Sequence, residues 1–295
     1  MNKIIVIVGP TGVGKTKMSV ELAKIYNGEI INADSMQIYK YLNIGTAKIK
    51  EDEKENIPHH LFDIKELDED YSIYHFQNDC RNMNDDLFDR EKTPVLVGGT
   101  GLYIKSALYD YTLSEEKITD TYDDLSDEEL YNLLISLDKD IVIDKNNRRR
   151  LIRAINYYKE FGKSINENNN KDKLLYDNVI FIGLTTDREN LYNKINLRVD
   201  KMIEEGLLDE VKDLYDKKIY TKPIINGIGY KEVYEYFDNK ISYEEMIEKI
   251  KQNSRRYAKR QYTFFKNQMN INWFNVDYNN FDNTINEVKE FIDKE

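Results

Sequence analysis

The segment Gly9–Thr16 combines residue types and spacings that suit it to holding phosphate groups. Its sequence, Gly-Pro-Thr-Gly-Val-Gly-Lys-Thr, fits the P-loop pattern G-x-x-x-x-G-K-[ST] at every fixed position. In such a loop the glycines let backbone N–H groups turn toward phosphate oxygens, the lysine supplies positive charge, and the Ser or Thr hydroxyl can ligate Mg²⁺. We therefore predict a diphosphate or triphosphate site, with Thr16 as metal ligand, formed by Gly9, Pro10, Thr11, Gly12, Val13, Gly14, Lys15 and Thr16.

A carboxylate, Asp34, closes the second predicted strand, Glu29–Asp34. Open α/β folds bind ligands at the carboxyl ends of their strands, so this side chain should lie at the binding edge. Its position alone allows three roles: taking a proton from a substrate, ligating a metal, or capping the next turn. After Pro94–Val97 the chain continues Gly-Gly-Thr-Gly and lacks the acidic residue that usually holds the metal of an NTPase, which argues against an ordinary ATPase.

The elements that must position these residues have an α/β pattern. The apolar run Lys3–Val8 predicts a central strand buried on both faces, and Lys15–Tyr26 has helical spacing. Further strands are predicted at 29–34, 94–99 and 178–184. Their alternation with helical segments indicates an α/β fold, a P-loop NTPase-like parallel sheet core flanked by helices.

The remaining segments are predicted to be helical. Between Thr112 and Tyr176 the strand pattern disappears, and the leucines at 130–137 predict one amphipathic helix. We therefore divide the chain into a core, residues 1–112 with 176–295, and a helical insertion at 113–175. From Arg188 the chain is expected to be helical almost to its end, and a capping box at Ser242 opens a long helix. One face of this helix is predicted to carry Tyr243, Met246, Ile247, Ile250, Tyr257, Gln261, Phe264 and Phe265.

Charge is distributed unevenly along the chain. The net charge is −11, and an acidic surface repels nucleic acid at long range. Residues 145–163 nevertheless carry net +6, and residues 249–266 carry net +7. Although charged runs are usually solvated helix faces, two such segments favour patches for a polyanion. The basic side chains expected to meet phosphates are Arg149, Arg150, Arg153, Lys259 and Arg260.

Other features restrict the compartment and the kind of site. The single cysteine, Cys80, excludes an internal disulfide and a Cys-based zinc site. A reducing cytoplasm is therefore expected. Apolar runs are far shorter than the about 20 residues of a membrane span, so secretion and a membrane partner are not expected. We also expect a monomer. His59 and His60 lack the spacing of a helical zinc site, and a structural or hydrogen-bonding role is predicted for them.

Ordered motifs along nearly the whole chain resemble those of the tRNA dimethylallyltransferases, also called tRNA isopentenyltransferases. Besides the P-loop, the matching segments are 32–39 (NADSMQIY), 44–48 (IGTAK), 58–61 (PHHL), 94–103 (PVLVGGTGLY), 150–154 (RLIRA), 227–232 (GIGYKE) and 258–261 (AKRQ). The chain departs from the family pattern at Gly12-Val13 and at Ile143–Arg148, and the segment before Arg148 is short.

The resemblance implies a particular reaction. A dimethylallyl group would pass from dimethylallyl diphosphate to the exocyclic amine of the adenosine 3′ of the anticodon, in a tRNA anticodon stem-loop. Asp34 would then be the general base, Thr100 would hydrogen-bond near the reacting centre, and Lys15 and Arg198 would stabilise the departing diphosphate. Thr16 would hold Mg²⁺, and the flipped adenosine would be lined by Ser35, Met36 and Gln37.

Two other functions remain open on the residues alone. A nucleoside or small-molecule kinase shares the P-loop and an aspartate near the second strand, but it leaves the basic segments unexplained. An RNA-binding P-loop protein with a regulatory nucleotide leaves Asp34 and Thr100 without roles. Since P-loop groups contact only phosphate oxygens and metal, we expect that ATP can still bind weakly to a loop that holds a prenyl diphosphate during turnover.

Overall fold

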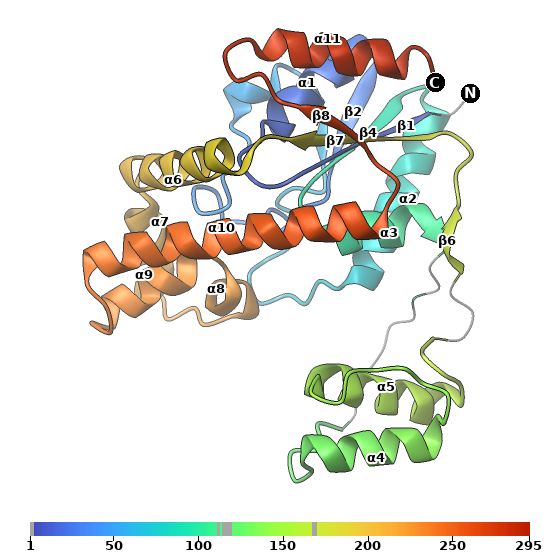
Figure 1. The fold of residues 1–295 in the computed structure, drawn as a ribbon. Helices are drawn as coiled ribbons and strands as arrows, with labels where there is room; N and C mark the ends of the chain where they lie inside the picture. Colours follow the sequence, from blue (N-terminus) through green and yellow to red (C-terminus); the bar gives the residue numbers. More distant parts are fainter. Residues whose placement is uncertain (1–2, 111–112, 114–119, 167–169) are drawn as a thin grey trace. The chain divides into compact units, whose positions relative to one another are not determined.

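A six-stranded, all-parallel sheet forms the centre of the larger unit (Figure 1). Its strand order is β3-β2-β4-β1-β7-β8. The computed structural model describes residues 3–110, 113, 120–166 and 170–295. The strands of this sheet are β1 (Ile4–Val8), β2 (Gly28–Asn32), β3 (His59–His60), β4 (Thr93–Val97), β7 (Val179–Thr185) and β8 (Asn272–Asn275). The predicted parallel core is therefore confirmed, with β1 in its interior.

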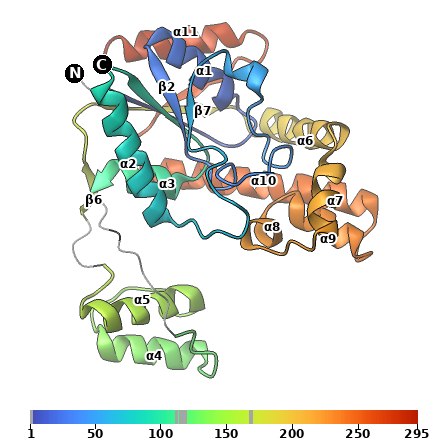
Figure 2. The same ribbon diagram turned by 180° about the vertical axis from the view of Figure 1, so that it is seen from behind.

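Helices cover both faces of the sheet, as Figures 1 and 2 show from opposite sides. Helices α1 (Lys15–Ile25) and α11 (Phe281–Ile292) lie together on one face. The helices that follow β3 and β4 are α2 (Ile73–Asp89) and α3 (Gly101–Leu108), and the short 3₁₀ helix η1 spans Glu51–Lys54. The later helices are α6 (Arg188–Glu204), α7 (Leu207–Asp216), α8 (Lys222–Asn226), α9 (Tyr230–Phe237) and α10 (Tyr243–Gln268).

The hydrophobic core fills both faces of β1, every residue of which is fully buried. Ile5 and Ile7 pack in one cluster with Leu22 of α1 and Val288 of α11. Helices α2 and α3 also pack together, and Phe76 of α2 stacks on Tyr103 of α3 with ring centroids 4.2 Å apart. Because the core fixes β1 so firmly, the loop that follows β1 starts from a rigid position.

The chain separates into two compact units. The core unit contains residues 1–108 and 176–295, and the insertion unit contains residues 109–175. The insertion unit holds α4 (Asp127–Leu137), α5 (Arg148–Phe161) and the antiparallel pair β5 (Tyr109–Asp110) and β6 (Asn170–Leu174). Leu130 and Leu134 of α4 pack on Leu151 and Ile155 of α5 in a core of their own. Part of the predicted insertion, residues 114–119 and 167–169, lies outside the described residues.

Two expectations about strands were wrong. The segment expected to lack strands contains β6, and the C-terminal part expected to be helical contains β8. Strand β8 adds to the edge of the sheet beside β7, where Gly183 leaves room for Trp273: a Cβ atom at Gly183 would lie 2.6 Å from that ring. Both strands are short, and their pairing depends on a partner distant in sequence rather than on a strong local pattern.

The expected helices are confirmed in the core unit. Helix α6 ends just before Gly206, and Ser242 opens α10 through a capping box with Glu245. Within the described ranges, no helix is long and apolar enough to cross a membrane.

Candidate functional site

The P-loop connects β1 to α1 in a backbone conformation that depends on glycine. Gly9, Gly12 and Gly14 have φ values of 142°, 90° and 89°, in the region that favours glycine. A Cβ atom at Gly9 would lie 2.4 Å from the carbonyl oxygen of Leu184. Gly14 caps α1 without any side-chain hydrogen bond, so the first N–H groups of the helix stay available for an anion.

Lys15, the first residue of α1, folds back over this loop. Its Nζ donates hydrogen bonds to the carbonyl oxygens of Gly9 and Pro10, each at 3.0 Å. Desolvation and the nearby Arg198 guanidinium lower the pKa of Lys15 to about 7, while Asp34 raises it. The positive charge of Lys15 is therefore only partly retained at neutral pH, and a bound anion would favour its protonated form.

Arg198 reaches the same region from α6. Its Nη2 donates to the carbonyl oxygen of Thr46 at 3.1 Å, and burial lowers its pKa while the Asp34 carboxylate raises it. Gln37 donates to the same Thr46 oxygen at 3.1 Å. The Thr46 carbonyl thus joins a residue of the Asp34 loop to the arginine.

Asp34 lies two residues beyond β2, in the loop that leaves the carboxyl edge of the sheet. Its backbone N–H donates to Asn32 Oδ1 at 2.9 Å, and its own Oδ1 accepts from the N–H of Met36 at 3.0 Å. One carboxylate oxygen therefore caps the turn, as one of the three predicted roles requires. The side chain also lines the cavity described below, so capping does not remove it from contact with a ligand.

Thr100 supports this loop from the glycine-rich turn after β4. Its Oγ1 accepts from the N–H of Ser35 at 3.0 Å and donates to Ser35 Oγ at 3.3 Å. Gly98 and Gly99 line the cavity, whereas Thr100 does not. In this structure Thr100 contacts the Asp34 loop rather than the open space in front of it.

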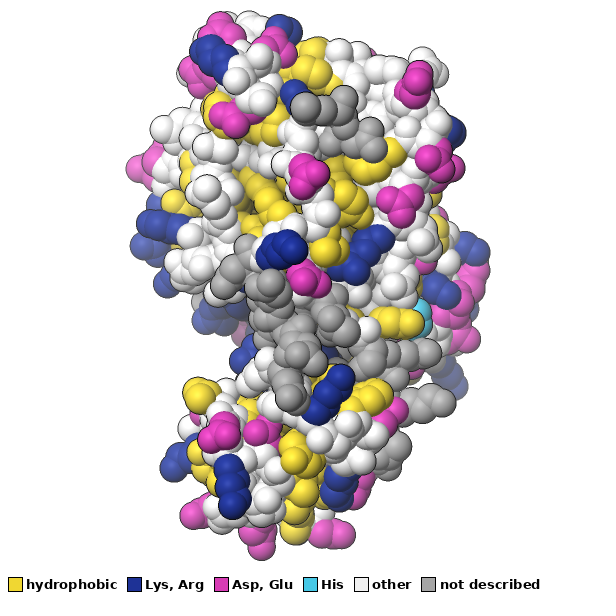
Figure 3. All heavy atoms as spheres, turned by 90° about the vertical axis from the view of Figure 1, so that its right-hand side faces the viewer, with side chains coloured by type: hydrophobic (Ala, Val, Ile, Leu, Met, Phe, Trp, Pro, Cys, Tyr) yellow, Lys and Arg dark blue, Asp and Glu magenta, His cyan; other side chains and the backbone are white. Residues whose placement is uncertain are grey.

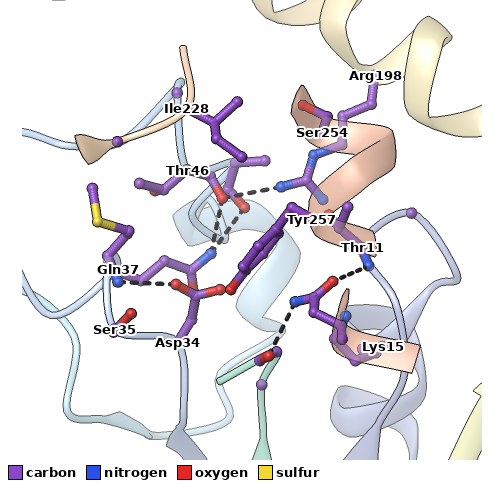
Figure 4. Close-up of a pocket in the computed structure, with 18 of the residues that line it drawn as sticks. Thr11, Lys15, Asp34, Ser35, Gln37, Thr46, Arg198, Ile228, Ser254 and Tyr257 are labelled. Atoms are coloured by element: carbon purple, nitrogen blue, oxygen red, sulfur yellow. Dashed lines mark hydrogen bonds between the residues drawn. The ribbon is translucent and has the colours of Figure 1, made fainter. Parts of the chain in front are cut away.

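A cavity of about 630 Å³ brings these groups together. Figure 4 shows Asp34, Arg198 and Tyr257 directed toward the same space, with Lys15 and Thr11 at its P-loop end. The predicted site residues that line the cavity are Thr11, Gly12, Gly14, Lys15, Thr16, Asp34, Ser35, Met36, Gln37, Arg198 and Arg260. Gly9, Pro10 and Val13, the remaining residues of the loop, are buried.

Two residues of α10, Gln261 and Tyr257, belong to the site but were not predicted there. Gln261 Oε1 accepts from the P-loop N–H of Thr11 at 2.9 Å, and its Nε2 donates to Gly99 O at 3.1 Å. Tyr257 directs its hydroxyl toward Asp34 (Figure 4). Burial and the Asp34 carboxylate raise the pKa of Tyr257 above its ordinary value, so the hydroxyl stays protonated and can donate.

The sequence placed both residues on the apolar stripe of the long helix. A polar atom on a buried stripe is the signal that could have identified them, because buried polar groups need partners.

The basic residues predicted to meet phosphates divide between the two units. Arg149 and Arg150 are exposed on α5, Arg153 is partly buried there, and Lys259 and Arg260 are exposed on α10. On the face of the insertion unit drawn in Figure 3, Lys and Arg side chains are interspersed with acidic and hydrophobic ones.

One basic residue of the 145–163 run has a structural role. Arg148 donates from Nη1 and Nη2 to the carbonyl oxygens of Leu125 and Tyr122, both at 2.6 Å, and pairs with Asp127. This arginine therefore holds the chain before α4 in place, and the charge that the run presents outward is smaller than the sequence count suggests.

The histidine pair has the hydrogen-bonding role predicted for it. His60 Nε2 lies 2.7 Å from Glu29 Oε2, and His59 Nδ1 lies 2.7 Å from the Ile57 carbonyl oxygen. Arg90 also binds Glu29, which ties β2 and β3 to the end of α2.

The fold and site define the chain as a P-loop α/β protein whose phosphate-binding loop opens into a cavity with a carboxylate. Comparison with known proteins narrows this class. A family model described as IPP transferase matches residues 37–268, and one described as isopentenyl transferase matches residues 2–71.

Individual relatives point to the same family as the family models. A tRNA dimethylallyltransferase of Anoxybacillus flavithermus is 50% identical, covering 99% of this chain and 96% of its own length; that of Geobacillus thermodenitrificans is 47% identical, covering 98% and 96%. The crystal structure of the tRNA isopentenylpyrophosphate transferase from Bacillus halodurans is 41% identical, with a TM-score of 0.77 over 100% of this chain and 96% of its own. The chain belongs to the tRNA dimethylallyltransferase family.

A eukaryotic dimethylallyltransferase acting on tRNA, also known from crystallography, is 31% identical. Its TM-score is 0.84, and the match covers 100% of this chain and 80% of the eukaryotic one.

Proposed function

We propose that this chain transfers the dimethylallyl group of dimethylallyl diphosphate to the exocyclic amine of the adenosine 3′ of a tRNA anticodon, and releases diphosphate. The observation that carries the proposal is that the P-loop and Asp34 line the same cavity. A phosphate-binding loop and a proton acceptor facing one space suit the displacement of a diphosphate by an amine.

The donor's diphosphate belongs at the P-loop end of the cavity. The N–H groups at the start of α1 would bind its oxygens, and Lys15 and Arg198 would stabilise the negative charge that builds up as it leaves. Arg198 is held ready by Thr46, so it needs little reorganisation during the reaction.

A magnesium ion fits this arrangement through the exposed Thr16 hydroxyl. Among the described residues no group of three His, Cys, Asp or Glu is placed to hold a metal, so most ligands of such an ion would be oxygens of the donor and water. When bound, the ion would neutralise charge on the diphosphate.

The acceptor's amine belongs at the Asp34 end. In the displacement the amine nitrogen forms a bond to C1 of the dimethylallyl group, and the bond from C1 to the diphosphate oxygen breaks. The amine proton passes to the Asp34 carboxylate. Ser35, Met36 and Gln37 would line the adenine, and Thr100 would keep their loop in place through Ser35.

Exposed basic residues would bind the rest of the tRNA. Arg149 and Arg150 of α5, together with Lys259 of α10, are accessible for phosphate contacts, and Arg153 belongs to the same basic run. Arg260 lies at the cavity and also on the α10 surface, where a nucleotide entering the cavity would pass it. A tRNA substrate is consistent with a cytoplasmic protein.

The test is to incubate the protein with labelled dimethylallyl diphosphate and a tRNA, and to locate the label by nuclease digestion. We expect label only on the adenosine next to the anticodon. A tRNA with guanosine at that position is the matched control and should stay unlabelled. Phosphate transfer from ATP to a nucleoside, measured in parallel, would instead support the kinase alternative.

A further inference from the structure

The loop Asn43–Ala47 turns several backbone N–H groups toward a single carboxylate, that of Glu210 on α7. Glu210 Oε2 accepts from the N–H groups of Asn43 at 3.1 Å and Ile44 at 2.8 Å. Its Oε1 accepts from the Gly45 N–H at 3.1 Å and from the Tyr230 hydroxyl at 2.7 Å. Successive N–H groups that converge in this way form an anion-binding nest, and here the anion is a side chain of the same protein.

The peptide that follows this nest holds two cavity residues. Thr46 O accepts from Arg198 Nη2 and from Gln37 Nε2, at 3.1 Å in each case. Any shift of residues 43–45 would move the Thr46 carbonyl, because the two segments are adjacent in the chain. The position of the Arg198 guanidinium is therefore linked to the nest.

We propose that Glu210 is a positioning residue for the transfer reaction, acting through Thr46 on Arg198 and Gln37. This inference rests on the proposed function of the cavity. The Glu210 carboxylate fills the nest with both of its oxygens, and so fixes the loop that orients the arginine. A glutamine could not replace it, because the amide group has one acceptor oxygen and its N–H₂ would face the N–H groups of the loop.

The partner residues of the nest fit this role. Tyr230 is fully buried, and burial together with Glu210 raises its pKa well above the ordinary value, so its hydroxyl remains a donor. A Cβ atom at Gly45 would lie 2.5 Å from the Tyr230 ring, so only glycine allows the loop to approach this closely. The segments 44–48 and 227–232 have no part in the proton transfer to Asp34. In this proposal they form the nest that holds Glu210.

Glu210 is also reachable from a second cavity of about 700 Å³, which Tyr41, Asn43 and Leu214 line with it. Removal of the Glu210 side chain would therefore open the nest toward this cavity. A small carboxylate such as acetate could then enter and take the place of the missing side chain.

The test uses inorganic diphosphate, whose affinity for the purified protein is measured by calorimetry with Mg²⁺ present. Glu210→Gln should weaken diphosphate binding about tenfold and lower the transfer rate about a hundredfold, since displacement of a positioning group by about 1 Å costs that much. Asp213 is an exposed carboxylate on the same helix and provides the control. Asp213→Asn should leave the diphosphate affinity and the transfer rate unchanged.

A double-mutant cycle separates positioning from a general loss of stability. In an Arg198→Ala background, Glu210→Gln should weaken diphosphate binding less than about twofold, because the group through which it acts is gone. Additive losses, or unchanged diphosphate affinity in Glu210→Gln, would overturn the proposal. Because diphosphate binding needs no tRNA, a wild-type protein that binds diphosphate but fails to transfer would contradict the proposed function and not this inference.

The variant Glu210→Ala tests the nest directly. Acetate should restore diphosphate affinity to this variant, while in the wild type and in Asp213→Asn it should have no such effect. If Glu210→Ala is folded by circular dichroism and acetate fails to restore binding, the nest assignment is wrong. If Glu210→Ala does not fold, the Glu210→Gln cycle decides the question alone.

Discussion

The two ends of the cavity differ in what they are made of. At the P-loop end the groups that face a ligand are mainly backbone N–H groups held by glycine conformations, with Lys15 added. At the Asp34 end they are side chains held by other side chains and by turns: Asp34 caps Met36, and Ser35 is bound to Thr100. Under the proposed function, the first arrangement would bind any diphosphate, whereas the second would require an acceptor that can give up a proton. The difference predicts that mutations at the two ends will fail in different ways.

The largest effect is expected at the Asp34 end. Asp34→Asn preserves shape and can still accept from the Met36 N–H through its amide oxygen, but it cannot take the amine proton. Loss of a general base typically costs about a hundredfold to ten-thousandfold in rate. We expect kcat to fall by that amount with diphosphate affinity unchanged, measured by single-turnover transfer and calorimetry. Near-normal transfer, or lost diphosphate binding, would contradict the assignment.

At the P-loop end, a mutation should reduce both the transfer rate and the affinity for diphosphate. Lys15→Ala and Arg198→Ala should each lower transfer about a hundredfold, the usual cost of removing one stabilising donor, and should also weaken diphosphate binding. Lys17, exposed on the first turn of the same helix, gives the control variant Lys17→Ala. If Lys15→Ala lost turnover but kept diphosphate affinity, the distinction between the two ends would fail.

The pKa of Lys15 sharpens the comparison further. Because this pKa is lowered to about 7, much of the amine is neutral above pH 7 and must gain a proton when an anion binds. Below that pH the amine is already protonated, so uptake should decline. Calorimetry in buffers of different ionisation enthalpy should show proton uptake by the wild type above pH 7. An arginine at this position is always charged, so Lys15→Arg should show no such proton uptake. Equal proton uptake in both proteins would contradict the assignment of the uptake to Lys15.

The smallest effects are expected outside the cavity. Arg150→Ala and Lys259→Ala should weaken tRNA binding, and each should reduce the slope of log affinity against log salt by about one unit. Diphosphate binding should not change. Lys294→Ala, near the C-terminus, is the control. An unaltered slope would mean that these residues lie on a solvated face.

How much of this could be predicted from the sequence depended on how local each feature is. The P-loop follows from a contiguous motif, and Asp34 follows from its place after a recognisable strand. The contributions of Tyr257 and Gln261 could not be predicted in the same way, because α10 lies far along the chain and reaches the cavity only through packing. Periodicity indicated that these side chains are buried, but not which polar groups they meet.

Charge counting had a similar limit. Arg148 adds to the basic run in the sequence, yet it binds carbonyl groups of its own unit. Strand β8 shows the limit for secondary structure: a four-residue segment after a long helix pairs because the edge of β7 is available. Tertiary contacts determine whether such a segment forms a strand and whether such a charge is exposed, and the local sequence pattern does not predict these contacts.

The central claim is that the P-loop of this chain holds a prenyl diphosphate during turnover and not a nucleotide. The most direct measurement is transfer to tRNA in nucleotide-free buffer containing Mg²⁺ and dimethylallyl diphosphate, with ATP then added at increasing concentration. We predict full transfer without nucleotide, and ATP acting at most as a competitor of the donor. A requirement for ATP, or its hydrolysis in step with product formation, would contradict the account.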